Sequence, residues 1–155
     1  MTTAITGACG EHYVASYLSG NGLIVALPRA GVKGSDLFIE EDDGHPLRIQ
    51  VKTGTQAYGS DKSGQFYSWD TSYTVINQLD PSQWFAYLWF NGWPKEPNLP
   101  ELFFVPSEIV VDHMKTQQAA NSKRPFFWMY VGEAENYRGA NGLILLRSAM
   151  KPKTA

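Results

Sequence analysis

Two short segments in the first third of the chain alternate between apolar and polar side chains. They cover residues 36–40 and 47–52, and Asp42-Asp43-Gly44-His45 between them has the composition of a turn. Such alternation is typical of β-strands, because successive side chains point to opposite faces. The sequence therefore predicts a β-hairpin with one uniformly apolar face, which carries Leu37, Ile39, Leu47, Ile49 and Val51.

The other face of this hairpin is mostly polar. It carries Asp36, Phe38 and Glu40 on the first strand and Arg48, Gln50 and Lys52 on the second. With the turn centred near Asp43 and Gly44, antiparallel pairing brings Asp36 to the level of residues 50–52. An acid, an amide and a lysine are expected to converge there, although an ordinary hairpin with a solvated polar face has the same pattern.

Other patterns predict helices and further strands around the hairpin. Helices are expected at residues 6–19, with Thr6 as N-cap, and at 72–78 and 107–120. Strands are expected at 23–27, 66–69, 84–90, 102–105 and 126–131, whereas 143–150 fits either a helix or a strand. Residues 54–64 are expected to form a glycine-rich polar loop. No repeat or linker divides the chain, so we expect one α/β domain over residues 1–155.

Composition excludes several classes of protein. No apolar run approaches the roughly 20 residues of a membrane span, and the first residues lack the pattern of a secretory signal. Cys9 is the only cysteine, which excludes an internal disulfide and a multi-cysteine zinc site. The net charge of -2 argues against coating of nucleic acid by bulk charge, while it allows a local basic groove. A soluble, cytoplasmic protein without membrane partners is therefore expected.

Glu11 is an acidic residue on the apolar side of the first predicted helix. Val14, Ala15 and Leu18 follow it by three, four and seven positions and so share its face. A carboxylate there needs a partner, or it lies at the edge of that face and interacts with the positive helix start. The three histidines (His12, His45 and His113) share no metal-ligand spacing, and we expect them at the surface.

Three short motifs on successive elements resemble those of a known family. They are Gly10-Glu11 on the helix, Gly34-Ser35-Asp36 at the start of the first hairpin strand and Gln50-Val51-Lys52 at the end of the second. Together they resemble the PD-(D/E)XK nuclease superfamily, and within it the small stand-alone members that include archaeal Holliday-junction resolvases. The resemblance implies the restriction-endonuclease-like fold, a mixed β-sheet core flanked by helices.

The resemblance also implies a metal site. Glu11, Asp36, Gln50 and the backbone carbonyl of Val51 would hold Mg²⁺ or Mn²⁺, with Lys52 beside the attacking water. Such an ion suits phosphodiester hydrolysis, because it activates water and stabilises charge on the phosphate oxygens. Two departures are Gln50, where the superfamily usually has an acid, and Ser35, where it usually has proline. An amide keeps an oxygen ligand but loses a negative charge.

Basic and aromatic residues offer contacts for a nucleic acid. The basic residues that flank the proposed site in sequence are Arg29, Lys33, Arg48 and Lys62, and a second basic group contains Lys123, Arg124, Lys151 and Lys153. Aromatic residues that could stack on bases are Tyr58, Phe66, Tyr67 and Trp69. Each basic residue is also explained by a solvated surface, and aromatics at strand spacing also fit a core.

These observations predict a metal-dependent nuclease that hydrolyses phosphodiester bonds in repair, recombination or defence. DNA is the expected substrate, RNA is an alternative, and a homodimer is compatible with the sequence. The rival prediction is a catalytically inactive module of the same fold that binds nucleic acid or a protein partner, because Gln50 replaces an acid. A third is an α/β domain with an unrelated function.

Overall fold

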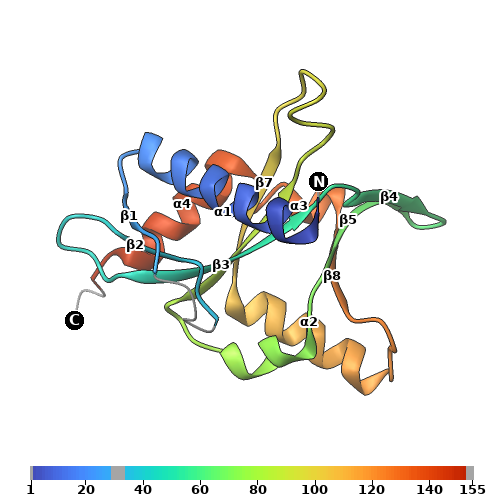
Figure 1. Ribbon diagram of the computed structural model, residues 1–155. Helices are drawn as coiled ribbons and strands as arrows, with labels where there is room; N and C mark the ends of the chain where they lie inside the picture. The colour runs from blue at the N-terminus through green and yellow to red at the C-terminus, as the bar shows by residue number, and fades with distance from the viewer. Residues whose placement is uncertain (1, 29–33, 153–155) are drawn as a thin grey trace.

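The predicted hairpin is present and forms one side of the larger of two β-sheets. The computed structural model describes residues 2–28 and 34–152, and its five-stranded sheet has the order β1-β2-β3-β6-β7 (Figure 1). The strands are β1 (Ile24–Ala26), β2 (Leu37–Glu40), β3 (Leu47–Gly54), β6 (Gln83–Trp89) and β7 (Glu101–Pro106). Neighbouring strands are antiparallel except β3 and β6, which are parallel, so the sheet is mixed as expected.

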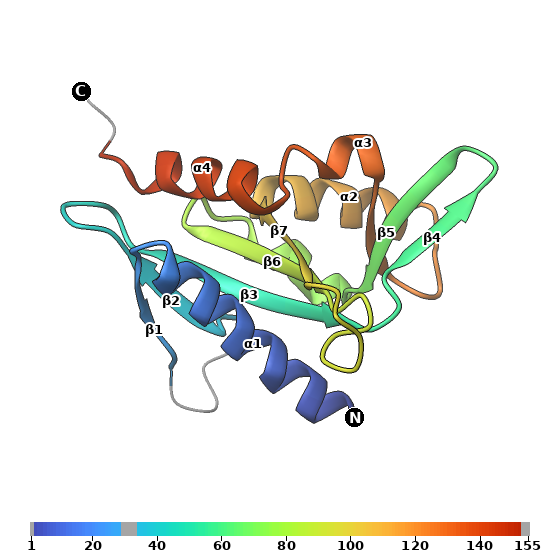
Figure 2. The same cartoon turned by 90° about the horizontal axis from the view of Figure 1, so that it is seen from above.

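A second sheet of three strands has the order β4-β5-β8. Its strands are β4 (Tyr58–Asp61), β5 (Gly64–Asp70) and β8 (Phe126–Tyr130), and the β4–β5 hairpin projects as an arm (Figure 2). The expected polar loop at residues 54–64 is therefore wrong, because β4 pairs with β5 from Tyr58 opposite Tyr67 onward. The ring of Phe66 packs directly on Gly59 in this hairpin, because a Cβ atom at Gly59 would lie only 3.1 Å from that ring.

Helices and the second sheet cover the two faces of the large sheet. The helices are α1 (Thr3–Gly20), the 3-10 helix η1 (Tyr73–Gln78), α2 (Ser107–Ala119), α3 (Val131–Ala134) and α4 (Gly139–Met150). One core joins α1 and α4 to the apolar face of the hairpin, where Leu18, Ile49 and Leu146 are fully buried. A second core on the opposite face joins α2 and the three-stranded sheet to Phe85 and Tyr87. None of the helices in the described ranges is long and apolar enough to cross a membrane.

The start of the first helix differs from the sequence prediction, and the structure decides between helix and strand for residues 143–150. The first helix begins at Thr3, and its N-cap is Thr2, whose side chain accepts from the Ile5 N–H (3.4 Å). The predicted N-cap at Thr6 is wrong, because the Thr6 hydroxyl lies inside the helix and donates to the Thr2 carbonyl (3.0 Å). Residues 143–150 are helical, since they belong to α4.

Candidate active site

Asp36 lies directly before β2 and beside the middle of β3. The register that places Leu37 opposite Ile49 puts Asp36 at the level of Gln50, as the alternation predicted. The Asp36 N–H donates to the Ile49 carbonyl (2.8 Å), and Asp36 Oδ2 accepts from the Val51 N–H (2.7 Å). The strand thus fixes the carboxylate, and its Oδ1 makes no hydrogen bond to any residue that the structure describes.

Glu11 is carried to this place by a close approach of α1 to β3. A Cβ atom on Gly10 would lie 1.8 Å from Thr53 Oγ1, so a larger residue does not fit this contact. Burial raises the pKa of the Glu11 carboxyl, and the negative charge of Asp36 raises it further. Because α1 begins at Thr3, Glu11 is well inside the helix, and the alternative role at the helix start is wrong.

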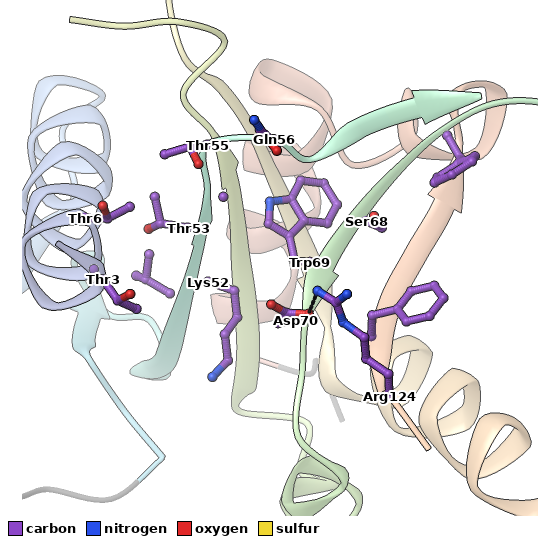
Figure 3. A pocket seen from close by; sticks show the side chains of 15 residues that line it. Thr3, Thr6, Lys52, Thr53, Thr55, Gln56, Ser68, Trp69, Asp70 and Arg124 are labelled. Carbon is purple, nitrogen blue, oxygen red and sulfur yellow. Dashed lines mark hydrogen bonds and ion pairs between the residues drawn. The ribbon is translucent and has the colours of Figure 1, made fainter. Parts of the chain in front are cut away.

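Lys52 shares a face of β3 with Gln50 and extends into a cavity between α1 and β5 (Figure 3). Burial lowers the pKa of its ammonium group, and the negative charge of Asp36 counteracts that shift. Lys52 is therefore a positive charge that interacts electrostatically with Asp36, which in turn interacts with Glu11. The structure brings Glu11, Asp36 and Lys52 into one electrostatic group, although they come from three elements.

Gln50 carries a buried amide oxygen, Oε1, without a hydrogen-bond partner among the described residues. An unpartnered buried acceptor costs free energy, and a cation would supply the missing interaction. Two carboxylates and this amide oxygen are the hard donors that Mg²⁺ and Mn²⁺ take, so the residues fit such an ion. Within the described ranges no group of three or more His, Cys, Asp or Glu could hold a metal, so a metal here would also need amide or backbone oxygens.

The cavity beside Lys52 has a volume of about 850 Å³. Its walls are the first turns of α1, residues 51–56 and the strands β5 and β8 (Figure 3). The start of α1 borders the cavity with Thr3, Thr6 and Gly7, and the N–H groups and dipole at a helix start favour anions. Arg124 lies on the opposite wall and pairs with Asp70 (3.3 Å). The cavity therefore has a helix start on one wall and the Arg124–Asp70 ion pair on the other, and Lys52 is the cation in its lining without an ion-pair partner among the described residues.

The other predicted phosphate contacts lie in different places. Arg48 pairs with Asp80 (2.7 Å) and borders a second cavity of about 470 Å³, which Gly34 and Ser35 also line. Lys62 lies in the turn of the β4–β5 arm and lines neither of these two cavities. Arg29 and Lys33 lie outside the described residues.

Several aromatic residues and one histidine are more buried than the sequence indicated. Tyr67 and Trp69 are each 3% exposed and belong to the core, so they are not available for stacking on bases. His12 and His45 are exposed as expected, but the surface role expected for His113 is wrong. Its ring packs edge-on against Trp128 (5.3 Å), and burial lowers its pKa.

Sequence reasoning missed the contribution of the second sheet to the cavity. Arg124 was part of a basic group that nothing in the sequence connected to the site, and Ser68 and Phe126 carried no signal at all. Ser68 belongs to β5 and Phe126 to β8, which pairs with β5 across more than 50 residues of chain. Only this pairing shows that they face the same cavity as Lys52.

Comparison with solved structures identifies the class of fold. The chain is similar to a bacterial homing endonuclease, I-Ssp6803I, with a TM-score of 0.60 and 17% sequence identity. The similarity covers 96% of this chain and 94% of that one. The chain therefore has a nuclease-type α/β fold. No protein-family model and no curated protein matches it, so membership of the PD-(D/E)XK superfamily stays a prediction.

Proposed function

We propose that this protein is a metal-dependent nuclease that hydrolyses phosphodiester bonds of DNA, with a site of the PD-(D/E)XK type. The observation that carries the proposal is the convergence of Asp36, Gln50 and Lys52, with Glu11 electrostatically coupled to Asp36. The fold of a homing endonuclease over nearly the whole chain supports it.

The oxygen donors of the proposed metal site come from α1, the start of β2 and the middle of β3. Glu11, Asp36 and Gln50 Oε1 would hold Mg²⁺ or Mn²⁺. The N–H and C=O of one strand residue point to the same side, so the Val51 carbonyl faces the same strand edge as its N–H, which Asp36 accepts. Val51 is therefore the fourth proposed ligand. The bound ion would lower the pKa of a water and stabilise charge on the phosphate.

Lys52 is the proposed catalytic partner of the attacking water. Its ammonium group can hold the water by a hydrogen bond and can neutralise the charge that develops on the phosphate oxygens. Asp36 keeps the charged form of Lys52 favourable despite burial. Arg124 and the start of α1 are proposed to bind phosphates of the DNA backbone on the two walls of the cavity.

A second candidate function is favoured by one observation. Gln50 supplies no negative charge, and no group of three acids, histidines or cysteines that could hold a metal occurs in the part of the chain that the structure describes. Such a site could bind metal too weakly for turnover, and the protein would then be an inactive nuclease-fold module that binds nucleic acid or a protein.

The discriminating experiment is incubation of the purified protein with supercoiled, linear and branched DNA and with RNA, in Mg²⁺, in Mn²⁺ or with a chelator. We expect cleavage of DNA that needs the metal and that Asp36→Ala abolishes. Asp42→Ala is the matched control, because Asp42 is exposed in the turn at the other end of the same hairpin. Binding without cleavage under every condition would support the inactive module. Equal cleavage by the two variants would place the site elsewhere.

A further inference from the structure

The outer face of the three-stranded sheet carries aromatic side chains around one small residue. In the register of β5 and β8, Ser68 lies opposite Trp128, Phe66 opposite Tyr130 and Asp70 opposite Phe126. Residues that are opposite each other or two apart on a strand share a face. Ser68 therefore has Phe66, Phe126 and Trp128 as its neighbours on that face.

The aromatic side chains on the outer face do not belong to the hydrophobic core. On the inner face of the same sheet, Tyr67, Trp69 and Phe127 are at most 3% exposed. On the outer face, Phe66, Phe126, Trp128 and Tyr130 are all only half-buried. Trp128 is held by edge-on contacts with Tyr130 (5.0 Å) and His113 (5.3 Å), so its orientation is fixed without full burial.

The short side chain of Ser68 lies between larger aromatic residues, and we call the part of the Lys52 cavity lined by Phe66, Ser68 and Phe126 the notch. Phe66, Ser68 and Phe126 all line that cavity, and Arg124 lies at its rim. The Ser68 hydroxyl makes no hydrogen bond to any described residue. The notch therefore has a small polar side chain at its base and aromatic side chains at its sides. A flat aromatic ligand attached to a phosphate would fit this combination of aromatic walls and nearby positive charge.

We propose that the notch around Ser68 receives an unpaired nucleobase of the DNA substrate, so that the site acts on DNA with an unpaired base beside the cleaved bond. This inference rests on the proposed function. A base within a duplex has its faces covered by its neighbours, whereas an unpaired base can stack on aromatic side chains. The backbone of the same strand would pass between Lys52 and Arg124.

Charge argues for a nucleic acid rather than a second copy of the chain as the occupant. The charged residues among the described ones that line the cavity are Lys52, Arg124 and Asp70, so their side chains carry one net positive charge. Arg124 and Asp70 lie directly beside the notch and are 82% and 78% exposed. Lysine and aspartate are depleted at protein–protein interfaces, whereas a positively charged groove lined by aromatic side chains is typical of sites that bind single strands.

The test is a binding assay with 2-aminopurine, a fluorescent base whose emission falls when it stacks. The probe is either a duplex with one unpaired 2-aminopurine or the same duplex with that base paired, in Ca²⁺ to favour binding without turnover. We expect quenching and about 5- to 150-fold tighter binding for the unpaired probe, the scale of one stacked base.

Two variants and one control separate stacking from folding effects. Ser68→Leu fills the notch, and Phe126→Ala removes one wall while Gln117 still holds the Phe126 backbone. Both should abolish the preference for the unpaired probe, with melting temperatures near that of the parent and affinity for the paired duplex within about twofold. Tyr58→Ser is the control, because Tyr58 lies on the opposite face of the same sheet and stacks on Trp89 (5.4 Å).

Each outcome decides the proposal. Equal affinity for the two probes, or an unchanged preference in both variants, overturns it. A change of oligomeric state in Ser68→Leu with unchanged preference also overturns it and assigns the face to contacts between copies. Metal-dependent cleavage of both probes without preference would refute this inference alone, whereas a preference without cleavage would refute the nuclease and keep the base-binding notch.

Discussion

Replacing Gly10 by alanine tests whether the close approach of α1 to β3 builds the site. In an exposed helix, glycine to alanine stabilises by about 0.8–1.0 kcal/mol. At Gly10 the added Cβ would lie 1.8 Å from Thr53 Oγ1, and even with that hydroxyl rotated away it would lie 3.0 Å from Thr53 Cβ. Thr53 must therefore change its rotamer and the helix and strand must separate slightly, and overpacking of this kind costs about 1–3 kcal/mol.

Gly7→Ala is the matched control on the same helix. A Cβ atom on Gly7 would meet nothing within 4 Å, so this variant should gain the full helix propensity of about 0.5–1 kcal/mol. Both variants gain helix propensity, so we expect Gly10→Ala to be less stable than Gly7→Ala by the overpacking cost of about 1–3 kcal/mol, as measured by urea unfolding at equilibrium. Gly10→Ala should also weaken Mg²⁺ binding in calorimetry, because it displaces Glu11.

A third variant, Thr53→Ala, tests whether the clash with Thr53 causes the loss of stability in Gly10→Ala. Thr53 Oγ1 is buried without a hydrogen-bond partner among the described residues, so its removal alone should cost little. The double variant should recover much of the stability that Gly10→Ala loses, with a coupling of about 0.5–3 kcal/mol, as for residues in contact. Stability of Gly10→Ala equal to that of Gly7→Ala would refute the close approach and, with it, the placement of Glu11.

Three further predictions concern the site and its surroundings. Gln50→Glu should tighten Mg²⁺ binding in calorimetry and lower the melting temperature of the metal-free protein, because it adds a third negative charge beside Asp36; unchanged affinity would mean that Gln50 is not a ligand. Lys52→Ala should melt near the parent and cleave DNA about 100-fold more slowly or worse, so near-normal cleavage would exclude the mechanism. Hydrogen bonds from Ser82 and the charge of Arg48 lower the pKa of Asp80 in the folded protein. The ionised carboxylate therefore stabilises the fold at pH values above the pKa of Asp80 in the unfolded chain, and this stabilisation is lost as the pH falls through the pKa in the folded protein. Asp80→Asn should therefore unfold less steeply with acid below about pH 4 and lose less than about 1 kcal/mol at pH 7, since the Asp80 side chain is 40% exposed; a parallel pH dependence of variant and parent would contradict this.

The sequence by itself determined the hairpin and the polar convergence on it. Alternation along residues 36–40 and 47–52 specifies which side chains share a face, and a turn centred near Asp43 and Gly44 places Asp36 at the level of Gln50. The buried strands β6 and β7 and the helix α2 were equally readable, because an apolar run or a helical period reports burial directly.

Only the tertiary structure decided what surrounds these residues. The β4 strand is polar and contains glycine, so its pairing with β5 left no period to read. Three features depend on contacts between segments that are more than ten residues apart in the sequence. They are the contact of Gly10 with Thr53, the burial of His113 against Trp128 and the position of Arg124 across the cavity from Lys52. Periodicity measures whether a side chain is buried, and it carries no information on which distant element buries it. That choice is made by how the helices and the second sheet pack onto the two faces of the large sheet.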